Sequence, residues 1–375
     1  MRILELLSSP AWTGPAEPMA SVATQLRARG HEVEVAVDSR RPGDLRQRLV
    51  ALGFAVRTDL ALTTRGLPPP LRADARRLRR IGPGFDVVHA HFSNDHAAAL
   101  VGLRRRGERP RVVRTVHSSR SLRGRLLQGV AHRRTDGLVA VCDAHARLLV
   151  ERFRVPPERV LATRGAVDCE AYRPEGPDLR AALGIAPGQP VAGIVARVKP
   201  DRRHAELVEA FRVVAGGLPE ARLLVVGRGE GLDAVAAQVR RLGLEGRVLL
   251  AGYRTGPELA AAYRTLDVKV LLAEGNDGTC RALLEAMACG RPGVAYDFGA
   301  PAEAIVQGRT GLRVPVGDVG GLAAALRELL GEPARARAMG VAARERMQAL
   351  YREDARGEAV ERFLLRILDL PPAAP

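Results

Sequence analysis

Residues 277–292 read Asp277-Gly-Thr-Cys-Arg-Ala-Leu-Leu-Glu285-Ala-Met-Ala-Cys-Gly290-Arg-Pro292, directly after an apolar run over 267–273. Gly290 and Pro292 are typical of residues that end a helix. The pattern therefore predicts a strand, a turn and a helix that holds two carboxylates about two turns apart. Because a helix N-terminus exposes unpaired N–H groups and partial positive charge, it favours an anion. Backbone amides can bind a phosphate and carboxylates can bind hydroxyl groups, so the two together suit a phosphorylated sugar.

This stretch resembles the acid-x7-Glu motif of the retaining glycosyltransferases with the GT-B fold, the large family four class. Asp277 and Glu285 have the motif's spacing, whereas Glu274 lies too far from Glu285 to fit it. The chain departs from the family in having Asp277 for glutamate, Cys280 for a frequent second glycine, and Ala282 near a usual proline. Without the family, the same residues also suit the strand–turn–helix unit of any α/β protein.

Strand and helix patterns alternate along the chain, which predicts α/β domains with parallel sheets. The first patterns are a strand at 2–8, a helix near 17–29 and a strand at 31–37. Further apolar runs follow at 86–89, 111–117 and 137–141, with helical stretches between them. After a segment rich in proline and glycine at 172–190, strand patterns recur at 191–196, 221–226, 248–251 and 268–272. We therefore predict two Rossmann-like domains, 1–176 and 177–354. The resemblance implies the GT-B arrangement, in which the domains face a cleft and a last helix, at about 355–375, returns to the first domain.

Composition is that of an ordinary soluble globular protein, with 46% hydrophobic and 27% charged residues. No apolar run reaches the ~18 residues of a membrane span, and the N-terminus does not have a signal-peptide pattern. The four cysteines lack zinc or redox spacing, so we expect reduced thiols in the cytoplasm.

The net charge of +16 is concentrated in the first half of the chain, where residues 1–175 hold 31 basic and 18 acidic residues. This asymmetry predicts an anionic partner: a membrane surface, an anionic acceptor or nucleic acid. The segment 71–80 predicts a basic helix, and Arg104–Arg106 form a second basic cluster, so we expect electrostatic docking on the inner face of the membrane. Coding bias toward arginine and a solvated helix face are the simpler explanations. With 3% aromatic residues, nucleic acid is not expected.

Two arginines follow the predicted strand at 191–196, in Arg197-Val-Lys-Pro-Asp-Arg202-Arg-His204. Ligands of parallel sheets bind at the carboxyl ends of strands, and two guanidinium groups can hold a diphosphate with charge-assisted bonds. The segment resembles the family's Arg-Leu-x-x-x-Lys-Gly element, whose two cations hold the leaving diphosphate. Arg202 takes the place of the lysine, and Arg203 replaces the glycine. A solvated basic turn is the alternative interpretation.

Two glycine-containing loops follow other predicted strands of the second domain. Gly252, Tyr253 and Arg254 occupy the place where, as the resemblance implies, the family meets the nucleotide base. Gly227-Arg-Gly-Glu-Gly231 lacks the full G-x-G-x-x-G spacing, so we interpret it as a tight strand–helix turn and not as a nicotinamide site.

Candidate residues of the first domain are Gly14, after the first strand, and His117, which ends the run 111–117. A glycine lets backbone approach a ligand closely, and the resemblance places Gly14 near the donor phosphate and His117 beside the transferred sugar. His89 and His91 share one strand face, and His96 follows closely, but no constellation of ligands sets a metal geometry there. We expect no metal.

The resemblance implies a metal-independent, hexosyltransferase-like retaining enzyme that transfers a sugar from a nucleoside-diphosphate sugar to an acceptor hydroxyl. A glycan or lipid-linked acceptor in cell-envelope glycolipid or polysaccharide synthesis is expected. The resemblance implies that Glu285 binds the donor ribose and that Asp277 and His117 bind the sugar. It also implies that two groups of residues bind the leaving phosphate. These are the cations Arg197 and Arg202 and the helix start Gly278, Thr279, Cys280 and Arg281.

Two alternatives remain open at this point. A nucleotide-sugar epimerase or a phosphorylase-like enzyme would keep the GT-B fold and change the reaction. A non-enzymatic protein would use the basic first domain to bind an anionic surface or nucleic acid.

Overall fold

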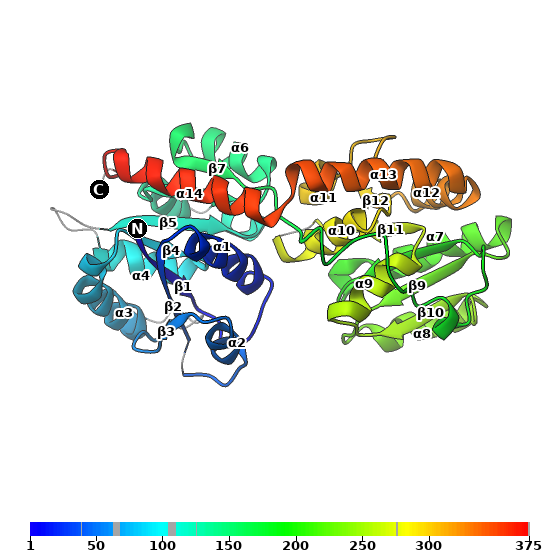
Figure 1. Ribbon diagram of the computed structural model, residues 1–375, viewed down its shortest axis with the longest axis horizontal. Coiled ribbons are helices and arrows are strands. Elements are labelled where there is room, and N and C mark those ends of the chain that lie inside the picture. Colours follow the sequence, from blue (N-terminus) through cyan, green and yellow to red (C-terminus); the bar gives the residue numbers. More distant parts are fainter. Residues whose placement is uncertain (39, 63–67, 104–109, 125, 275–276, 374–375) are drawn as a thin grey trace. The chain divides into compact units, whose positions relative to one another are not determined.

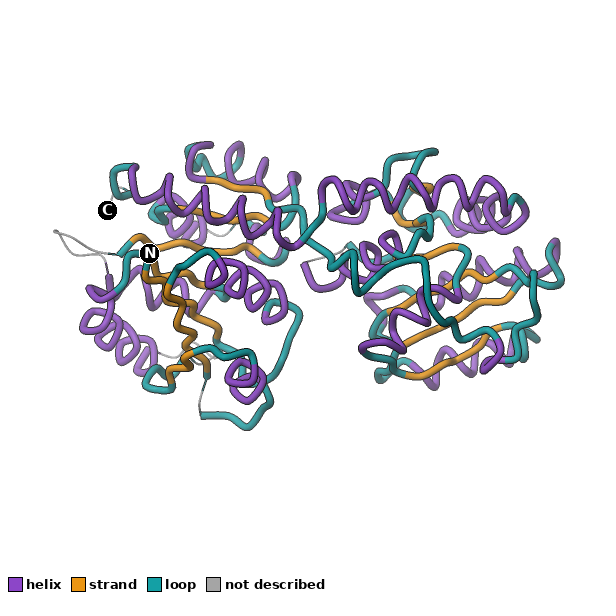
Figure 2. Tube along the Cα trace, viewed as in Figure 1, coloured by secondary structure: helices purple, strands orange, loops and turns teal. Residues whose placement is uncertain are grey.

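A computed structural model describes residues 1–373, except residues 39, 63–67, 104–109, 125 and 275–276. The chain divides into two compact units. The first is built from Met1–Gly165 and Glu353–Pro375, and the second from Ala166–Gly275 and Thr279–Arg352. In each unit helices flank a central sheet, as Figure 2 shows.

The first unit contains a seven-stranded parallel sheet in the order β3-β2-β1-β4-β5-β6-β7. Its strands are β1 (Arg2–Leu7), β2 (Glu32–Val37), β3 (Ala55–Arg57), β4 (Val87–Ala90), β5 (Arg111–Val116), β6 (Gly137–Ala140) and β7 (Val160–Ala162). Its helices are α1 (Ala16–Ala28), α2 (Leu45–Ala51), α3 (Pro68–Ile81), α4 (Ser93–Leu103), α5 (Leu126–Arg133), α6 (Asp143–Glu151) and α14 (Glu353–Asp369).

The last helix, α14, packs on the first unit, as the resemblance implied (Figure 1). Its apolar stripe joins α1 and the sheet in one hydrophobic core: Val360, Phe363, Leu364 and Ile367. A Cβ atom on Gly137 of β6 would lie 3.0 Å from ring carbon Cε1 of Phe363, so a side chain at this position would press against the helix. On the opposite face, α3 and α4 cover a second core that includes Leu4, Leu6 and Val88.

The second unit contains a six-stranded parallel sheet in the order β10-β9-β8-β11-β12-β13. Its strands are β8 (Val191–Val195), β9 (Arg222–Val226), β10 (Val248–Gly252), β11 (Val268–Leu271), β12 (Gly293–Tyr296) and β13 (Gly311–Val314). Its helices are α7 (His204–Gly217), α8 (Leu232–Arg241), α9 (Gly256–Thr265), α10 (Asp277–Ala288), α11 (Gly299–Ala304), α12 (Val319–Gly331) and α13 (Pro333–Leu350).

The expected α/β architecture of two parallel sheets is confirmed. Four strands were not predicted, namely β3, β7, β12 and β13. Each is three or four residues long. Among the described residues, no helix combines the length and apolar character that crossing a bilayer requires.

In each sheet the chain adds strands first toward one edge and then toward the other. The switch point lies between β1 and β4 in the first sheet and between β8 and β11 in the second. In open α/β sheets the carboxyl ends of strands at such a switch point form the ligand crevice. The two switch points are therefore where each unit's candidate site residues are expected.

Candidate functional site

The predicted cation pair lies at the switch point of the second sheet. Arg197 is exposed on the loop after β8, and Arg202 is half-buried at the end of a short 3-10 turn, Pro200–Arg202. Arg202 Nη1 lies 3.2 Å from Asp201 Oδ2. Both guanidinium groups thus belong to the segment that joins β8 to α7, where an anion can also meet the N-terminus of that helix.

Arg203 takes up the backbone conformation for which the family uses glycine. Its φ is +59°, in the left-handed region. Its guanidinium pairs with Glu206, with Nη1 2.9 Å from Oε1, and lies 5.4 Å from the centre of the Tyr296 ring. The left-handed turn before α7 is thus present with arginine at this position, and these contacts hold the arginine side chain.

The glycines after β9 support the loop that carries Arg197. The N–H of Ala196 donates to the carbonyl of Val226 at 3.1 Å, which extends the sheet beyond β8. A Cβ atom would lie 1.9 Å from Ala196 O if added to Gly227 and 2.3 Å from Val198 O if added to Gly229. This packing requires glycine at both positions and confirms the interpretation of 227–231 as a tight strand–helix turn.

The loop at Gly252–Arg254 lies against the same turn. The Gly252 carbonyl accepts a 2.9 Å hydrogen bond from Gly227 N–H, and the Arg228 guanidinium stacks 4.4 Å from the centre of the Tyr253 ring. The Tyr253 side chain is 53% exposed, so it offers an aromatic surface at the edge of the sheet. Arg254 Nε lies 3.9 Å from Glu258 Oε2.

Helix α10 begins at Asp277 as predicted, and Glu285 is held on its buried side. Glu285 is 3% exposed. Its Oε2 accepts a 2.6 Å hydrogen bond from the Tyr263 hydroxyl, and its Oε1 accepts a 2.8 Å bond from Arg281 Nε. Burial raises the pKa of Glu285, and the bonds from Arg281 and Tyr263 oppose that rise. Tyr172 also hydrogen-bonds this carboxyl. A carboxylate has about four acceptor positions, so about one remains for a hydroxyl group of a ligand.

The side chains at residues 277–279 lie outside the described residues. The predictions for Asp277, Gly278 and Thr279 therefore stay predictions. Cys280 is buried in α10.

Sequence reasoning missed Lys269, a fully buried lysine of β11. Its Nζ donates to the carbonyl of Val270 at 2.8 Å. Burial lowers the pKa of Lys269 to about 7, although the charge of Glu285 raises it. The available signal was a lysine inside an apolar strand, in a chain whose only other lysine is Lys199. Tyr263 was also missed, because nothing local links it to Glu285.

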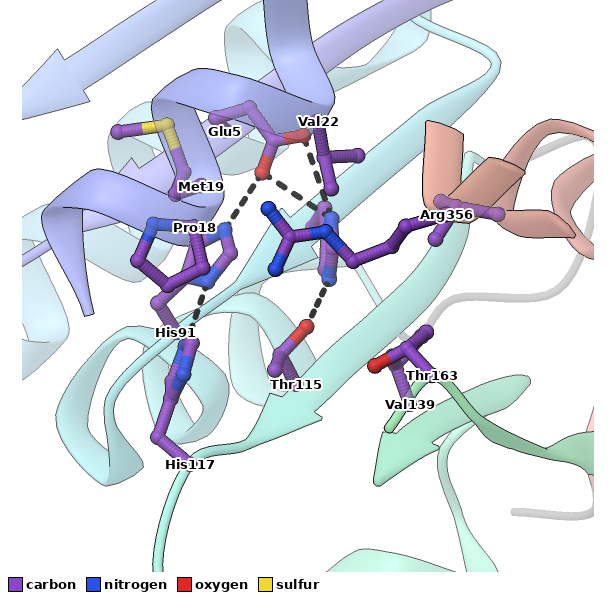
Figure 3. A pocket seen from close by; sticks show the side chains of 12 residues that line it. Glu5, Pro18, Met19, Val22, His91, Thr115, His117, Val139, Thr163 and Arg356 are labelled. Atoms are coloured by element: carbon purple, nitrogen blue, oxygen red, sulfur yellow. Dashed lines mark hydrogen bonds and ion pairs between the residues drawn. The ribbon is translucent and has the colours of Figure 1, made fainter. Parts of the chain in front are cut away.

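A buried histidine cluster occupies the switch point of the first sheet (Figure 3). His117 Nε2 lies 2.9 Å from His91 Nδ1, and His91 Nε2 lies 2.7 Å from Glu5 Oε2. His89 Nδ1 lies 3.2 Å from Glu5 Oε1, and His89 Nε2 lies 2.8 Å from the Thr115 hydroxyl. These residues surround a cavity of about 20 Å³, enough for one water molecule.

Gly14 lies in the exposed turn between β1 and α1, so it also follows a strand of this switch point. His96 does not join His89 and His91. Its Nε2 bonds the Thr135 hydroxyl at 2.7 Å, and its Nδ1 lies 3.1 Å from Arg114 Nη1.

Glu5, His89 and His91 present three ligating atoms within 4.8 Å of one another. Those atoms already bond within the cluster, which accounts for their proximity without a metal ion. The expectation of no metal stays a prediction. Glu5 was missed by sequence reasoning, although it occupies an inward position of an apolar strand.

Two family models match the chain. Glycosyl transferases group 1 matches residues 176–346, and Glycosyltransferase Family 4 matches residues 15–171. The D-inositol 3-phosphate glycosyltransferase of Nocardia farcinica is 31% identical over 358 residues, covering 86% of this chain and 78% of the relative. The N-acetyl-alpha-D-glucosaminyl L-malate synthase of Bacillus anthracis is 27% identical over 343 residues, covering 88% of each.

Solved structures share the fold. A glycosyltransferase from Rickettsia africae superimposes with a TM-score of 0.82 at 16% identity, over 99% of both chains. Anabaena HepE, solved in complex with UDP and glucose, gives a TM-score of 0.79 at 19% identity, over 97% of this chain and 99% of HepE. The matched families, the full-length relatives and the two parallel sheets agree, and the chain is therefore a glycosyltransferase of group 1 with the GT-B fold.

Proposed function

We propose that the protein transfers a sugar from a nucleoside-diphosphate sugar to an acceptor hydroxyl with retention of configuration. The observation that carries the proposal is the placement of Arg197 and Arg202 at the switch point of the second sheet, on a segment that Gly227 and Gly229 hold in place. Two guanidinium groups at that position suit a diphosphate.

Bond cleavage in such a donor builds negative charge on the leaving phosphate. Arg197, Arg202 and the N–H groups of the first turn of α10 would stabilise that charge. Because this cluster of donors supplies the positive charge, we propose that the reaction needs no metal ion.

The remaining residues would hold the donor's hydroxyl groups. Glu285 keeps about one acceptor position for the ribose, and Asp277 would bind the sugar. Tyr253 and the backbone of Gly252 would lie against the base. His117 would contact the sugar, as its position in the family implies.

We propose an anionic acceptor. Residues 1–175 carry 31 basic and 18 acidic residues, a surplus of 13 positive charges. The names of two relatives contain acidic small molecules, D-inositol 3-phosphate and L-malate. A basic acceptor domain would raise the local concentration of such molecules.

A lipid-linked acceptor in cell-envelope glycolipid or polysaccharide synthesis is the second candidate. It is favoured by Leu126 and Leu127 at the start of α5, whose side chains are 82% and 83% exposed. Arg123, before α5, and Arg133 and Arg134, at its end, are exposed too. Leucines beside arginines suit the surface of an anionic membrane, so this candidate includes peripheral binding at the cytoplasmic face. The Arg104–Arg106 cluster lies outside the described residues.

Calorimetric titration with UDP, GDP, ADP and CMP in the presence of EDTA tests the donor site. We expect saturable binding of one nucleoside diphosphate, and loss of that binding in Glu285→Ala. A folded protein that binds none of the four would contradict the proposal, and binding that requires Mg²⁺ would contradict its metal-independent form.

Transfer assays then separate the candidate reactions. UDP-glucose and UDP-N-acetylglucosamine are offered with inositol phosphate, malate or a lipid-linked sugar, and proton NMR of the product reads the anomeric configuration. Conversion of the donor's sugar without any acceptor would favour the epimerase alternative. Sedimentation with anionic and neutral vesicles tests the membrane surface.

A further inference from the structure

Three side chains form a continuous hydrogen-bonded line at the carboxyl ends of β1, β4 and β5: Glu5, His91 and His117. Parallel pairing sets Glu5 of β1 opposite His89 of β4, and His91 follows on the same face of the sheet. The three side chains are buried beneath α1 and α14, where Met19 and Arg356 line the same cavity (Figure 3).

The carboxylate determines where the protons of this line reside. Burial raises the pKa of Glu5, but the charges and hydrogen bonds of His89 and His91 outweigh burial and lower the pKa to about 2. Glu5 is therefore ionised and can only accept. Each imidazole nitrogen that faces it must carry a hydrogen, so His91 Nε2–H donates to Glu5 Oε2 and His89 Nδ1–H donates to Glu5 Oε1.

Because His91 is neutral, the position of the proton between His91 and His117 follows. Burial, with repulsion from His89, lowers the pKa of His91 to about 4, so its ring is neutral near pH 7. A neutral imidazole with its hydrogen on Nε2 has a lone pair on Nδ1. The 2.9 Å contact between His91 Nδ1 and His117 Nε2 is a hydrogen bond only if His117 donates. A neutral His117 therefore carries its proton on Nε2 and has none on Nδ1.

We infer that Glu5 and His91 are positioning residues that hold His117 in the Nε2–H tautomer and leave its Nδ1, which lies buried in this structure, as a hydrogen-bond acceptor that a hydroxyl of the transferred sugar reaches when the donor binds. The role toward sugar rests on the proposed function. The logic resembles that of an acid–base triad, in which a buried carboxylate selects the tautomer of a histidine that works on the substrate. Here a second imidazole lies between the carboxylate and the working histidine.

Histidine NMR tests the tautomer without any assay of activity. The protein is labelled with ¹⁵N-histidine, and the His117 signals are assigned by their loss in His117→Gln. We expect a protonated Nε2 and an unprotonated Nδ1 at pH 7.5. Addition of UDP-glucose should shift the Nδ1 resonance as the sugar donates to it, whereas UDP, which has no transferred sugar, should not. A wild-type His117 with its proton on Nδ1 would overturn the inference.

Glu5→Gln tests the carboxylate. The amide has the same shape, but its NH₂ group can donate to His91, which moves the His91 proton to Nδ1 and removes the acceptor for His117. We expect a mixed or reversed His117 tautomer and at least a ~10-fold lower kcat for UDP release from UDP-glucose, with KM within ~2-fold. Unchanged kcat in a folded variant whose tautomer has moved would overturn the positioning role.

Thr115→Val is the matched control. Its hydroxyl bonds His89 Nε2 in the same cavity and lies outside the line from Glu5 to His117. We expect wild-type His117 signals and turnover, with some loss of stability. Equal loss of kcat in both variants would mean general damage to the cluster and overturn the inference. Stoichiometric, EDTA-reversible shifts of the His89 and His91 signals on adding Zn²⁺ would also overturn it, because the cluster would then be a metal site.

The proposed function and the hydrogen-bonded line from Glu5 to His117 can fail separately. If the protein binds no nucleotide and releases no UDP, the proposed function fails, and the tautomer of His117 in the wild-type spectrum still decides the hydrogen-bonded line. If Glu5→Gln does not fold, the same wild-type spectrum and the UDP-glucose shift decide the inference.

Discussion

A Cβ atom at residue 227 would lie 1.9 Å from the carbonyl oxygen of Ala196, far inside van der Waals contact. The turn after β9 therefore lies directly on the backbone of the segment that carries Arg197. The same contact surface includes the hydrogen bond from Val198 N–H to the Arg228 carbonyl, at 3.1 Å. The position of the cation loop thus depends on a glycine in a different strand–helix unit.

Gly227→Ala should destabilise the second unit by about 3 kcal/mol or more, because two backbone segments must separate to admit the methyl group. Nucleoside-diphosphate binding should fall as Arg197 moves. Urea unfolding and calorimetric titration measure the two effects. Gly216→Ala on the exposed side of α7 is the control, since nothing lies within 4 Å of its Cβ position. It should stabilise the protein by about 0.5–1 kcal/mol, and equal losses in both variants would refute the packing argument.

Arg197→Ala should lower kcat at least ~100-fold, on the scale of removing one donor to a developing negative charge. Arg202→Ala should have an effect of similar size. Arg212→Ala is the control, because that arginine is exposed on α7 and pairs only locally with Glu209, at 2.9 Å. Initial rates of UDP release from the donor measure all three variants. A near-normal kcat in Arg197→Ala would remove this residue from the phosphate site.

Tyr263→Phe removes the donor of the 2.6 Å hydrogen bond to Glu285. The buried carboxyl loses one hydrogen bond and keeps those from Arg281 and Tyr172, so we expect a loss of about 1–3 kcal/mol in stability. Because the bond holds Glu285 in place, the affinity for the nucleoside diphosphate should also fall, by about 3- to 10-fold. Chemical denaturation and titration measure the two quantities. Wild-type affinity in a destabilised variant would mean that Glu285 does not bind the ribose.

The first unit should lose stability in mild acid because of its buried histidines. Burial, with repulsion from Arg114, lowers the pKa of His132 to about 4 from an unfolded value near 6.5. Between those values the unfolded state binds the proton and the folded state does not. The contribution of His132 is therefore complete above pH 6.5 and falls by about 1.4 kcal/mol per pH unit down to pH 4.

The His132→Gln variant separates the contribution of His132 to stability from that of the other titrating groups. The glutamine amide can still donate to the Ser121 carbonyl, which lies 3.1 Å from His132 Nε2. Urea unfolding at several pH values from 7 to 4 should show a slope smaller by about 1.4 kcal/mol per pH unit than in the wild type. Parallel curves would mean that His132 is protonated in the folded state over this range. Asp95 titrates in the opposite sense, because burial raises its pKa to about 7, and it is common to both proteins.

Phe363→Ala should cost about 3–5 kcal/mol, the usual cost of removing a buried aromatic ring. Phe363 lies in the core between α14, α1 and the first sheet. Leu365→Ala on the same helix is the control, since Leu365 is 45% exposed and should cost under ~1 kcal/mol. Thermal unfolding compares the two. Equal small losses would show that α14 is not part of the first unit's core.

Much of the fold could be predicted from local patterns. The apolar runs at 2–8, 191–196 and 268–272 became β1, β8 and β11, and the helix that begins at Asp277 was recognised by its spacing and its stop signals. The short strands β12 and β13 were missed, and no local pattern gives their place in the sheet, where β12 pairs with β11 and β13 pairs with β12.

The candidate site was predicted only where its residues are close in sequence. Arg197 and Arg202 share one loop, and a resemblance to a family motif pointed to both. Tyr263 and Glu285 belong to different helices, and no spacing rule links them. Lys269 is a buried cation that the sequence could have indicated, because it interrupts an apolar strand.

The sequence by itself determined the alternation of strands and helices and the family. These are local properties, set by side-chain period, turn residues and short spacings. The tertiary structure decided which side chains meet: His91 lies 86 residues from Glu5 and 26 from His117, yet it bonds both. Alternation along a strand predicts a shared face, but the order of strands in the sheet decides which faces are neighbours, and that order depends on the packing of the whole domain.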